Sequence, residues 1–164
     1  VIVLKSKWDG ETMVVNTPYD VQDEYVTQLR AQLTDPNSTR LGKGLEWIYD
    51  DIPKARTTQA YPRISVLQLT NPAEAHALGS KKDRITVNLL IQIRVARQKF
   101  DSKSPPQFLG EIESDVIEAI RTDAFRESLR TNAGVFNIRL VGDQTIPTDE
   151  VLIREIQIEN IMER

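Results

Sequence analysis

The sequence predicts an α+β domain in which a mainly antiparallel sheet carries two helices packed on one face. The clearest observation is the segment 84–97, where apolar and polar side chains alternate with the two-residue period of a strand that has one buried face. Two further segments, 17–33 and 106–130, repeat apolar residues every three or four positions, which is the period of a helix. The expected elements follow the order α-β-β-α-β-β, behind an N-terminal arm of residues 1–16.

The N-terminal arm has no clean period. Residues 1–4 are apolar and could add a strand to a sheet, whereas residues 5–11 have the composition of a polar turn around Asp9-Gly10. A flexible arm and a docked strand both remain open at this point.

A single domain is expected over residues 17–164, beginning with a helix near Thr17. Thr17 suits the N-cap and Asp20 the third helical position, because their side-chain oxygens can accept hydrogen bonds from the free backbone amides of the first turn. Pro18 suits the first helical position, because proline lacks the amide that would be left unpaired there. The apolar stripe of this helix recurs every four residues and consists of Val21, Tyr25, Leu29 and Leu33.

Two loops interrupt the regular pattern, at residues 37–60 and 71–83, and we expect both to make interactions. The first loop contains an apolar group at residues 45–49, for which a short element is expected. Its Trp47 is either a packing anchor or a binding hot spot.

The first two strands are expected at residues 63–70, after Tyr61-Pro62, and at residues 84–97. The long second strand places one set of residues on an apolar face, and these are Ile85, Val87, Leu89, Ile91, Ile93 and Val95. The opposite face is mostly polar and carries Arg84, Thr86, Asn88, Leu90, Gln92 and Arg94.

The second helix is expected to open with a capping box at residues 104–107 and to extend to about Arg130, with a kink near Thr122-Asp123 and a stop at Gly134. Two strands follow, at residues 135–141 and 150–161, joined by turn residues that include Gly142-Asp143-Gln144 and Pro147-Thr148-Asp149. The first of them is expected to place Phe136, Ile138 and Leu140 on one face.

Composition excludes several functional classes. Lys and Arg number 21 against 24 Asp and Glu, so a net charge of −3 does not suit a strongly basic nucleic-acid binder. No apolar run approaches the roughly 20 residues that a membrane-spanning helix needs. The absence of cysteine excludes disulfides, thiol catalysis and cysteine-ligated zinc, and a single histidine excludes a histidine-rich metal centre.

The sequence offers no recognisable catalytic signature. Gly42-Lys43-Gly44 lacks the spacing of a phosphate loop, and no nucleophile elbow is present. His76 lies in a polar loop between two alanines, where a solvated side chain is the simpler interpretation. We therefore expect no enzyme activity, no catalytic residue, no cofactor and no metal.

The order of these elements resembles that of the tail terminator, or tail completion, proteins of long-tailed bacteriophages. The resemblance covers about residues 17–161. Its matching pieces are Tyr19–Leu33, Tyr61–Val66, Arg84–Arg97, Pro106–Arg130, Val135–Val141 and Val151–Ile161. Relatives of this fold also serve as other neck and tail-joining proteins.

The resemblance implies a structural protein of the virion tail or neck, assembled in the host cytoplasm. In that family six copies form a ring on the last ring of tail tube protein, stop tube polymerisation and dock to the head-side connector or stopper protein. DNA passes through the lumen of the ring, and in contractile phages a similar ring also holds the last ring of sheath protein. No cofactor is implied.

The candidate interface residues are taken from the arm, the apolar group of the first loop and the charged ends of the long strand. They are Val1, Ile2, Val3, Trp47, Ile48, Tyr49, Lys81, Lys82, Arg84 and Arg94. Two alternatives remain: another neck protein, such as a connector or stopper, and a small ligand-binding α+β module. An enzyme would need Asp50 and Asp51 to meet glutamates from far along the chain.

Overall fold

The computed structural model describes residues 2–5, 12–38, 40, 47–52, 61–69, 84–98 and 102–163. Its main sheet has five strands in the order β3-β4-β5-β7-β6, in which every neighbouring pair is antiparallel except β3 and β4. The strands are β3 (Ile48–Tyr49), β4 (Arg63–Gln68), β5 (Arg84–Ala96), β6 (Val135–Pro147) and β7 (Val151–Glu163). The predicted α+β class is confirmed.

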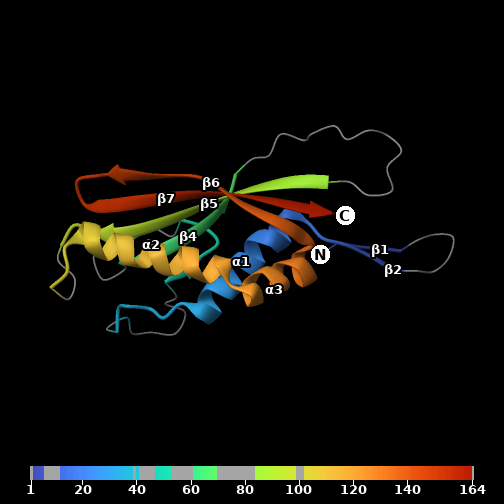
Figure 1. The fold of residues 1–164 in the computed structure, drawn as a ribbon, viewed down its shortest axis with the longest axis horizontal. Helices are drawn as coiled ribbons and strands as arrows, with labels where there is room; N and C mark the ends of the chain where they lie inside the picture. The colour runs from blue at the N-terminus through green and yellow to red at the C-terminus, as the bar shows by residue number, and fades with distance from the viewer. Residues whose placement is uncertain are drawn as a thin grey trace.

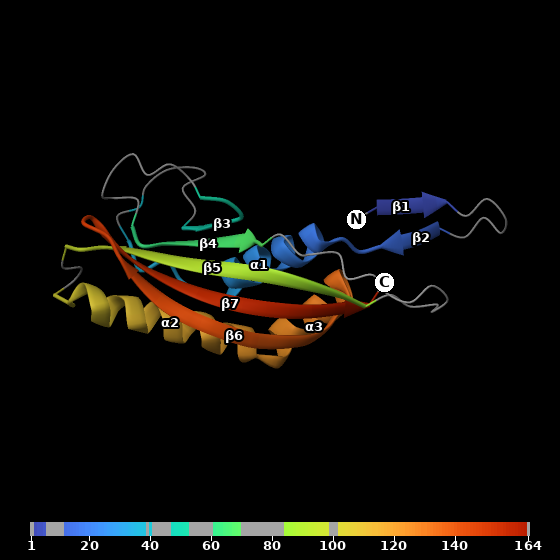
Figure 2. The same cartoon turned by 90° about the horizontal axis from the view of Figure 1, so that it is seen from above.

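Helices α1 (Pro18–Gln32), α2 (Pro105–Arg121) and α3 (Asp123–Ala133) cover one face of this sheet (Figure 1, Figure 2). We call this the near face and the opposite one the far face. The apolar residues of β5 face the helices, as the alternation predicts. They are buried in the core between the sheet and the helices, and they are Val87, Leu89, Ile91, Ile93 and Val95. None of the described helices is long and apolar enough to cross a membrane.

Helix α1 begins where the capping residues predict. The Asp20 carboxylate accepts hydrogen bonds from the Thr17 backbone amide at 2.5 Å and from the Thr17 hydroxyl at 2.7 Å. Further along, the buried Tyr25 ring packs edge-on against Phe125 of α3, with ring centroids 5.1 Å apart. Its hydroxyl donates to Asn160 Oδ1 on β7 at 2.8 Å, so α1 is joined to both α3 and the sheet.

The second predicted helix is two helices, with the break at the expected place. The Thr122 hydroxyl donates to the Ala119 carbonyl that ends α2, and it accepts from the Phe125 amide in the first turn of α3. Gly134 ends α3 in the left-handed conformation, with φ of 67°, as the stop signal predicts. Ser104 lies at the N-cap of α2, but the predicted capping box is wrong because its side chain forms no capping hydrogen bond.

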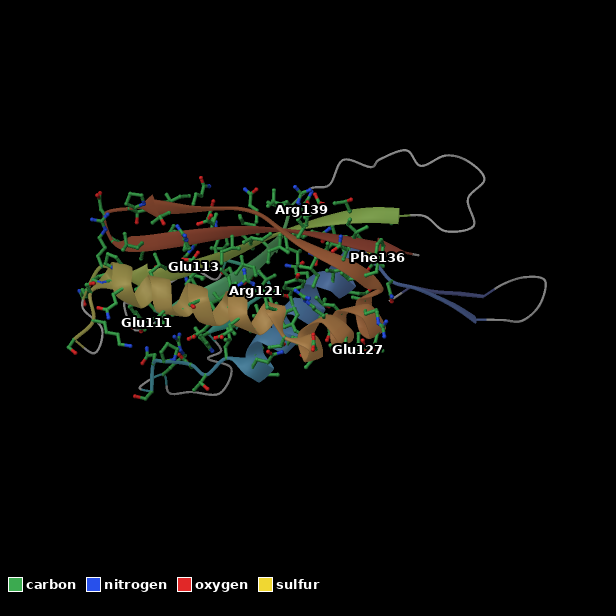
Figure 3. All side chains as sticks on the ribbon, viewed as in Figure 1. Glu111, Glu113, Arg121, Glu127, Phe136 and Arg139 are labelled. Atoms are coloured by element: carbon green, nitrogen blue, oxygen red, sulfur yellow. The ribbon has the colours of Figure 1, made fainter. Side chains whose placement is uncertain are left out.

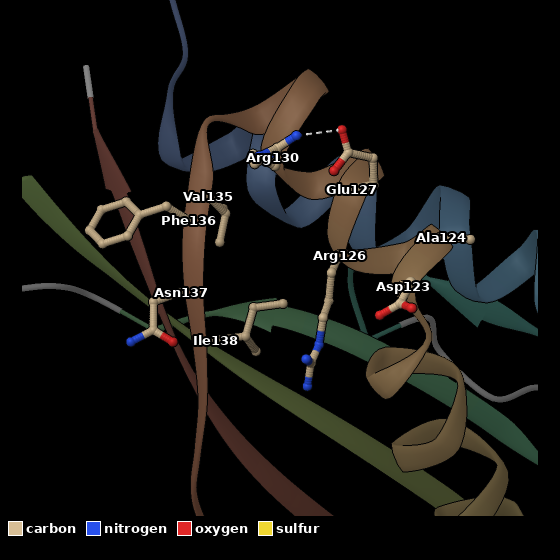
Figure 4. Close-up of a pocket in the computed structure, with 9 residues that line it drawn as sticks. All are labelled: Asp123, Ala124, Arg126, Glu127, Arg130, Val135, Phe136, Asn137 and Ile138. Carbon is tan, nitrogen blue, oxygen red and sulfur yellow. Dashed lines mark hydrogen bonds and ion pairs between the residues drawn. The ribbon is translucent and has the colours of Figure 1, made fainter.

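Strand β6 is longer than predicted. The expected turn residues Gly142-Asp143-Gln144 continue the strand, because each of them pairs with β7. Two irregularities in register, between Val135 and Asn137 and between Leu140 and Gly142, shift which residues share a face. The prediction that Phe136 shares a face with Ile138 and Leu140 is therefore wrong: Phe136 is 46% exposed and points to the other side of the strand from Ile138, and Val135 is buried (Figure 4).

The N-terminal arm forms a hairpin instead of joining the main sheet. Strand β1 (Ile2–Lys5) pairs antiparallel with β2 (Thr12–Val15), and together they make a separate two-stranded sheet. The hairpin projects beyond the end of the five-stranded sheet (Figure 1, Figure 2). Of the two predicted interaction loops, 71–83 and most of 37–60 lie outside the described residues.

Candidate interaction surfaces

The sequence-predicted interface residues do not gather on one surface. Three of them, Val1, Lys81 and Lys82, lie outside the described residues, so the structure does not test their predicted role. Ile2 and Val3 belong to β1 of the projecting hairpin, which places them on an arm as expected. Arg84 is the first residue of β5, where its backbone is in register with that of Glu163.

The apolar group of the first loop divides between the core and the far face. Trp47 and Ile48 are 8% and 0% exposed and belong to the core of the chain itself. They are packing anchors, and their prediction as contacts between subunits is corrected, since so little of either side chain reaches the surface. Tyr49 is half-buried and lies beside Ser65 on the far face.

Arg94 belongs to a set of polar side chains on the far face of the sheet. The strand register places five residues in one line across all five strands, and we call them the polar row: Tyr49, Ser65, Gln92, Glu155 and Gln144. Hydrogen bonds join its members, because Gln92 and Gln144 each donate to one oxygen of Glu155 at 2.6 Å. Arg94 Nη2 donates to Gln92 Oε1 at 2.7 Å and extends this network.

The far face is buried near β4. Arg63, Ser65, Gln92 and Glu155 are all 9% exposed or less. Burial lowers the pKa of Arg94, and repulsion from Arg63, its cross-strand neighbour, lowers it further. The Arg63 guanidinium lies 5.0 Å from the centre of the Tyr61 ring, where it gains a cation–π interaction. This part of the face is therefore a packed polar layer, and Arg94 contributes to it.

Edge strand β6 carries three of the large hydrophobic side chains that the described residues expose. The described residues expose five large hydrophobic side chains, of which three lie within six residues of β6: Phe136 at 46%, Leu140 at 48% and Val141 at 54%. Protein edge strands usually carry charges or are covered, because an exposed apolar edge invites pairing with another chain. Sequence reasoning did not select these residues. The signal for them was the broken alternation of this segment, where Val135-Phe136 and Leu140-Val141 are adjacent apolar pairs.

Leu140 lines a hollow of about 230 Å³ between α2, α3 and β6, which we call the α2–β6 groove. Its walls carry six aliphatic side chains and two arginines: Ile117, Ile120, Ile138, Leu140, Ile156, Ile158, Arg121 and Arg126. A wider hollow of about 660 Å³ lies next to it and shares Arg126 and Ile138. Figure 4 shows Arg126 reaching from α3 toward β6, while Phe136 points to the other side of the strand.

The acidic side chains of α2 do not form a catalytic or metal-binding cluster. Glu111 and Glu113 are spaced along the helix (Figure 3), where Glu111 pairs with Lys103 and Glu113 with Arg154 at 2.8 Å. The hydrogen bond to the Glu113 carboxylate raises the pKa of Arg154. Arg154 also forms an ion pair with Asp143, which raises this pKa further. Among the described residues, no group of His, Asp and Glu side chains could hold a metal ion.

The remaining candidates for chemistry give no site. Asp50 and Asp51 are exposed beside β3, and His76 lies outside the described part of the chain. A comparison with models of known protein families gave no match, and a comparison with curated proteins gave no significant match. The geometry of the surfaces is therefore what bears on function.

Proposed function

We propose that this chain is a structural protein of the virion, a tail terminator that forms a ring of six subunits on the end of the tail tube. The observation that carries the proposal is the exposed apolar stretch of edge strand β6, because an apolar edge favours contact with another chain. The projecting hairpin supports it, since the chain then has two separate surfaces that suit assembly.

Two separate surfaces of this kind are compatible with a closed ring. When two different patches on one chain bind each other, subunits add head to tail, and they form a ring if the rotation closes or a filament if it does not. A terminator must form the ring, since its function is to stop growth. Six subunits would have a mass of about 112 kDa, six times the 18.7 kDa of the chain.

The proposed ring lies between the last ring of tube protein and the connector or stopper protein of the head. The ring requires no cofactor and catalyses no reaction. Its lumen passes the genome, and the net charge of −3 suits a pore along which DNA moves without binding tightly. The order of elements resembles that of the tail terminator family, which supports this position.

The length of tail tubes tests the proposal. Tube protein is assembled with and without this chain, and tube lengths are measured by electron microscopy. We expect tubes of a set length with one ring at the end when the chain is present, and longer, uncapped tubes without it. Unchanged tube length and bare tube ends would refute the tail terminator function. Binding to a head-side portal or connector protein alone would instead support the role of another neck protein.

A further inference from the structure

We propose that residues 50–52 of one copy dock in the α2–β6 groove of the next copy, and that this contact joins the subunits of the ring. The inference rests on the proposed ring and names two surfaces that would make it. Residues 50–52 are Asp50, Asp51 and Ile52, and we call them the acidic segment. They follow β3 directly, and all three are exposed, with Ile52 at 47%.

The charge of the groove favours an acidic occupant. Arg121 and Arg126 are exposed at the groove, and neither forms an ion pair with an acidic side chain of the described residues. The rest of the lining is aliphatic. An occupant with two carboxylates beside an apolar side chain would therefore form charge-assisted hydrogen bonds and cover apolar surface in the same contact.

The acidic segment has this combination of groups. Two pairs of adjacent exposed acids occur among the described residues, Asp50-Asp51 and Asp149-Glu150, and none of the four side chains forms an ion pair within this part of the chain. Of the two pairs, Asp50-Asp51 alone adjoins a large exposed hydrophobic side chain, that of Ile52. Its two carboxylates match the two guanidinium groups of the groove in number and are opposite in sign.

The position of the acidic segment makes the contact one between copies. Strands β3 and β6 are the two edges of the sheet, with three strands between them, so the segment lies at the edge opposite its own groove (Figure 2). Helix α1 holds the segment there, because Gln22 Nε2 donates to the Asp50 carbonyl at 2.7 Å and to the Val66 carbonyl at 2.8 Å. Contact between opposite edges of neighbouring copies adds subunits head to tail, as a ring requires.

Reversal of charge tests the contact. One variant combines Asp50→Arg with Asp51→Arg, and the other combines Arg121→Asp with Arg126→Asp. Each variant alone places like charges against each other, so ring capture on tube ends, counted in electron micrographs, should fall at least about tenfold. An equal mixture should restore capture to within about twofold of wild type, because every contact in an alternating ring of six again joins Asp to Arg.

The matched control reverses the other exposed acidic pair. Asp149→Arg combined with Glu150→Arg should change capture by less than about twofold, and this variant should not restore capture when it is mixed with the Arg121→Asp, Arg126→Asp variant. Normal capture by the variant reversed at residues 50 and 51, or a mixture of the two proposed surfaces that stays inactive, would overturn the contact.

Cysteine cross-linking separates this contact from the proposed ring, because the chain contains no cysteine. Ile52→Cys is mixed with Leu140→Cys and oxidised, both on tail tubes and as concentrated free protein. We expect disulfide-linked dimers of about 37 kDa, twice the chain mass of 18.7 kDa, from the mixture. Neither variant alone should give them, because a head-to-tail contact does not bring two copies of one residue together.

The outcomes distinguish the two proposals. Rings on tube ends without dimers from the mixture would overturn the contact and leave the ring intact. Dimers from the free mixture, together with tubes that carry no ring, would support the contact and refute the tail terminator function. The absence of both rings and dimers would overturn both proposals.

Discussion

Ile91 and Gln92 are neighbours on strand β5 and point to opposite faces of the sheet. Ile91 is fully buried on the near face among aliphatic and aromatic side chains, and Gln92 is 8% exposed on the far face. Gln92 is surrounded by polar partners, with Glu155 and Arg94 within hydrogen-bonding distance. The near face is thus held by apolar burial, whereas the centre of the far face is held by hydrogen bonds among groups that have lost water.

The comparison teaches that the alternation of a strand determines where a side chain points and does not determine whether water reaches it. Apolar burial tolerates small changes of shape, but a buried polar group leaves its partner unsatisfied when it is removed. Changes on the two faces should therefore destabilise the chain by different amounts and for different reasons, and the following predictions are ordered by the size of the effect.

The largest effect is expected for Ile91→Asp. An unpaired carboxylate at the centre of the near face has no hydrogen-bond donor in reach of its apolar surroundings, so the free energy of unfolding should fall by at least about 4 kcal/mol. This loss is comparable to the whole stability of many domains. Chemical denaturation followed by circular dichroism measures it. A variant that unfolds within 1 kcal/mol of wild type, on the order of an ordinary surface change, would mean that the near face is not the core.

A smaller loss, about 2 kcal/mol, is expected for Gln92→Ala, because Glu155 and Arg94 each lose a hydrogen-bond partner in a buried layer. Its matched control is Gln157→Ala, which removes the same side chain from an exposed far-face position on β7 and should change stability by less than about 0.5 kcal/mol. Equal midpoints of denaturation for the two variants would show that the polar row contributes nothing.

The near face also contains a buried polar contact, between Tyr25 and Asn160. Tyr25→Phe should lower the free energy of unfolding by about 1 kcal/mol, because Asn160 Oδ1 loses its donor. Burial raises the pKa of Tyr25 above its ordinary value of 10.0.

The unfolded chain therefore releases this proton above pH 10 while the folded chain retains it, so the contribution of Tyr25 is fully present below pH 10 and is lost as the pH rises further. Stability measured from pH 8 to 11 should fall more steeply for wild type than for Tyr25→Phe. Parallel curves would mean that Tyr25 titrates normally.

The smallest effect on stability is expected at the exposed edge. Leu140→Ser should change the free energy of unfolding by less than about 0.5 kcal/mol, since half of this side chain already contacts water. The same variant should form fewer rings on tube ends than wild type, by counts in electron micrographs. A large loss of stability with normal ring formation would reverse this assignment and make Leu140 part of the core.

Much of the fold could be predicted from local signals. The N-cap at Thr17, the break at Thr122 and the stop at Gly134 are each set by hydrogen bonds and backbone preferences within a few residues. The near face of β5 followed from its two-residue period, because one apolar face of a sheet must be buried.

Other features depend on contacts that the sequence does not reveal locally. Gly142-Asp143-Gln144 has the composition of a turn, yet pairing with β7 keeps it extended. The same pairing introduces the irregularities that expose Val141 and turn Phe136 away from the buried face. The face of β5 that carries Gln92 was predicted to be mostly polar, but the sequence does not reveal that the polar row buries this position, leaving Gln92 8% exposed.

The candidate surfaces divide in the same way. The N-terminal arm was predicted as a segment apart from the domain because it has no clean period, and in the structure it forms a separate two-stranded sheet. Trp47 and Ile48 were chosen as interface residues because they are large and apolar. Core residues have the same character, so only the burial of the two side chains in the structure separates the two roles. The groove beside Leu140 was missed, since residues of α2, α3, β6 and β7 come together there only in the folded chain.

The most direct test of the proposed ring is the mass and symmetry of this protein on tail-tube ends. Capped tubes are examined by electron microscopy with class averaging, and the cap released from them is weighed by native mass spectrometry. The account predicts a closed six-fold ring of about 112 kDa, from a chain of 18.7 kDa that is monomeric before it meets the tube. A cap that is absent, or a species that grows into filaments instead of closing, would contradict it.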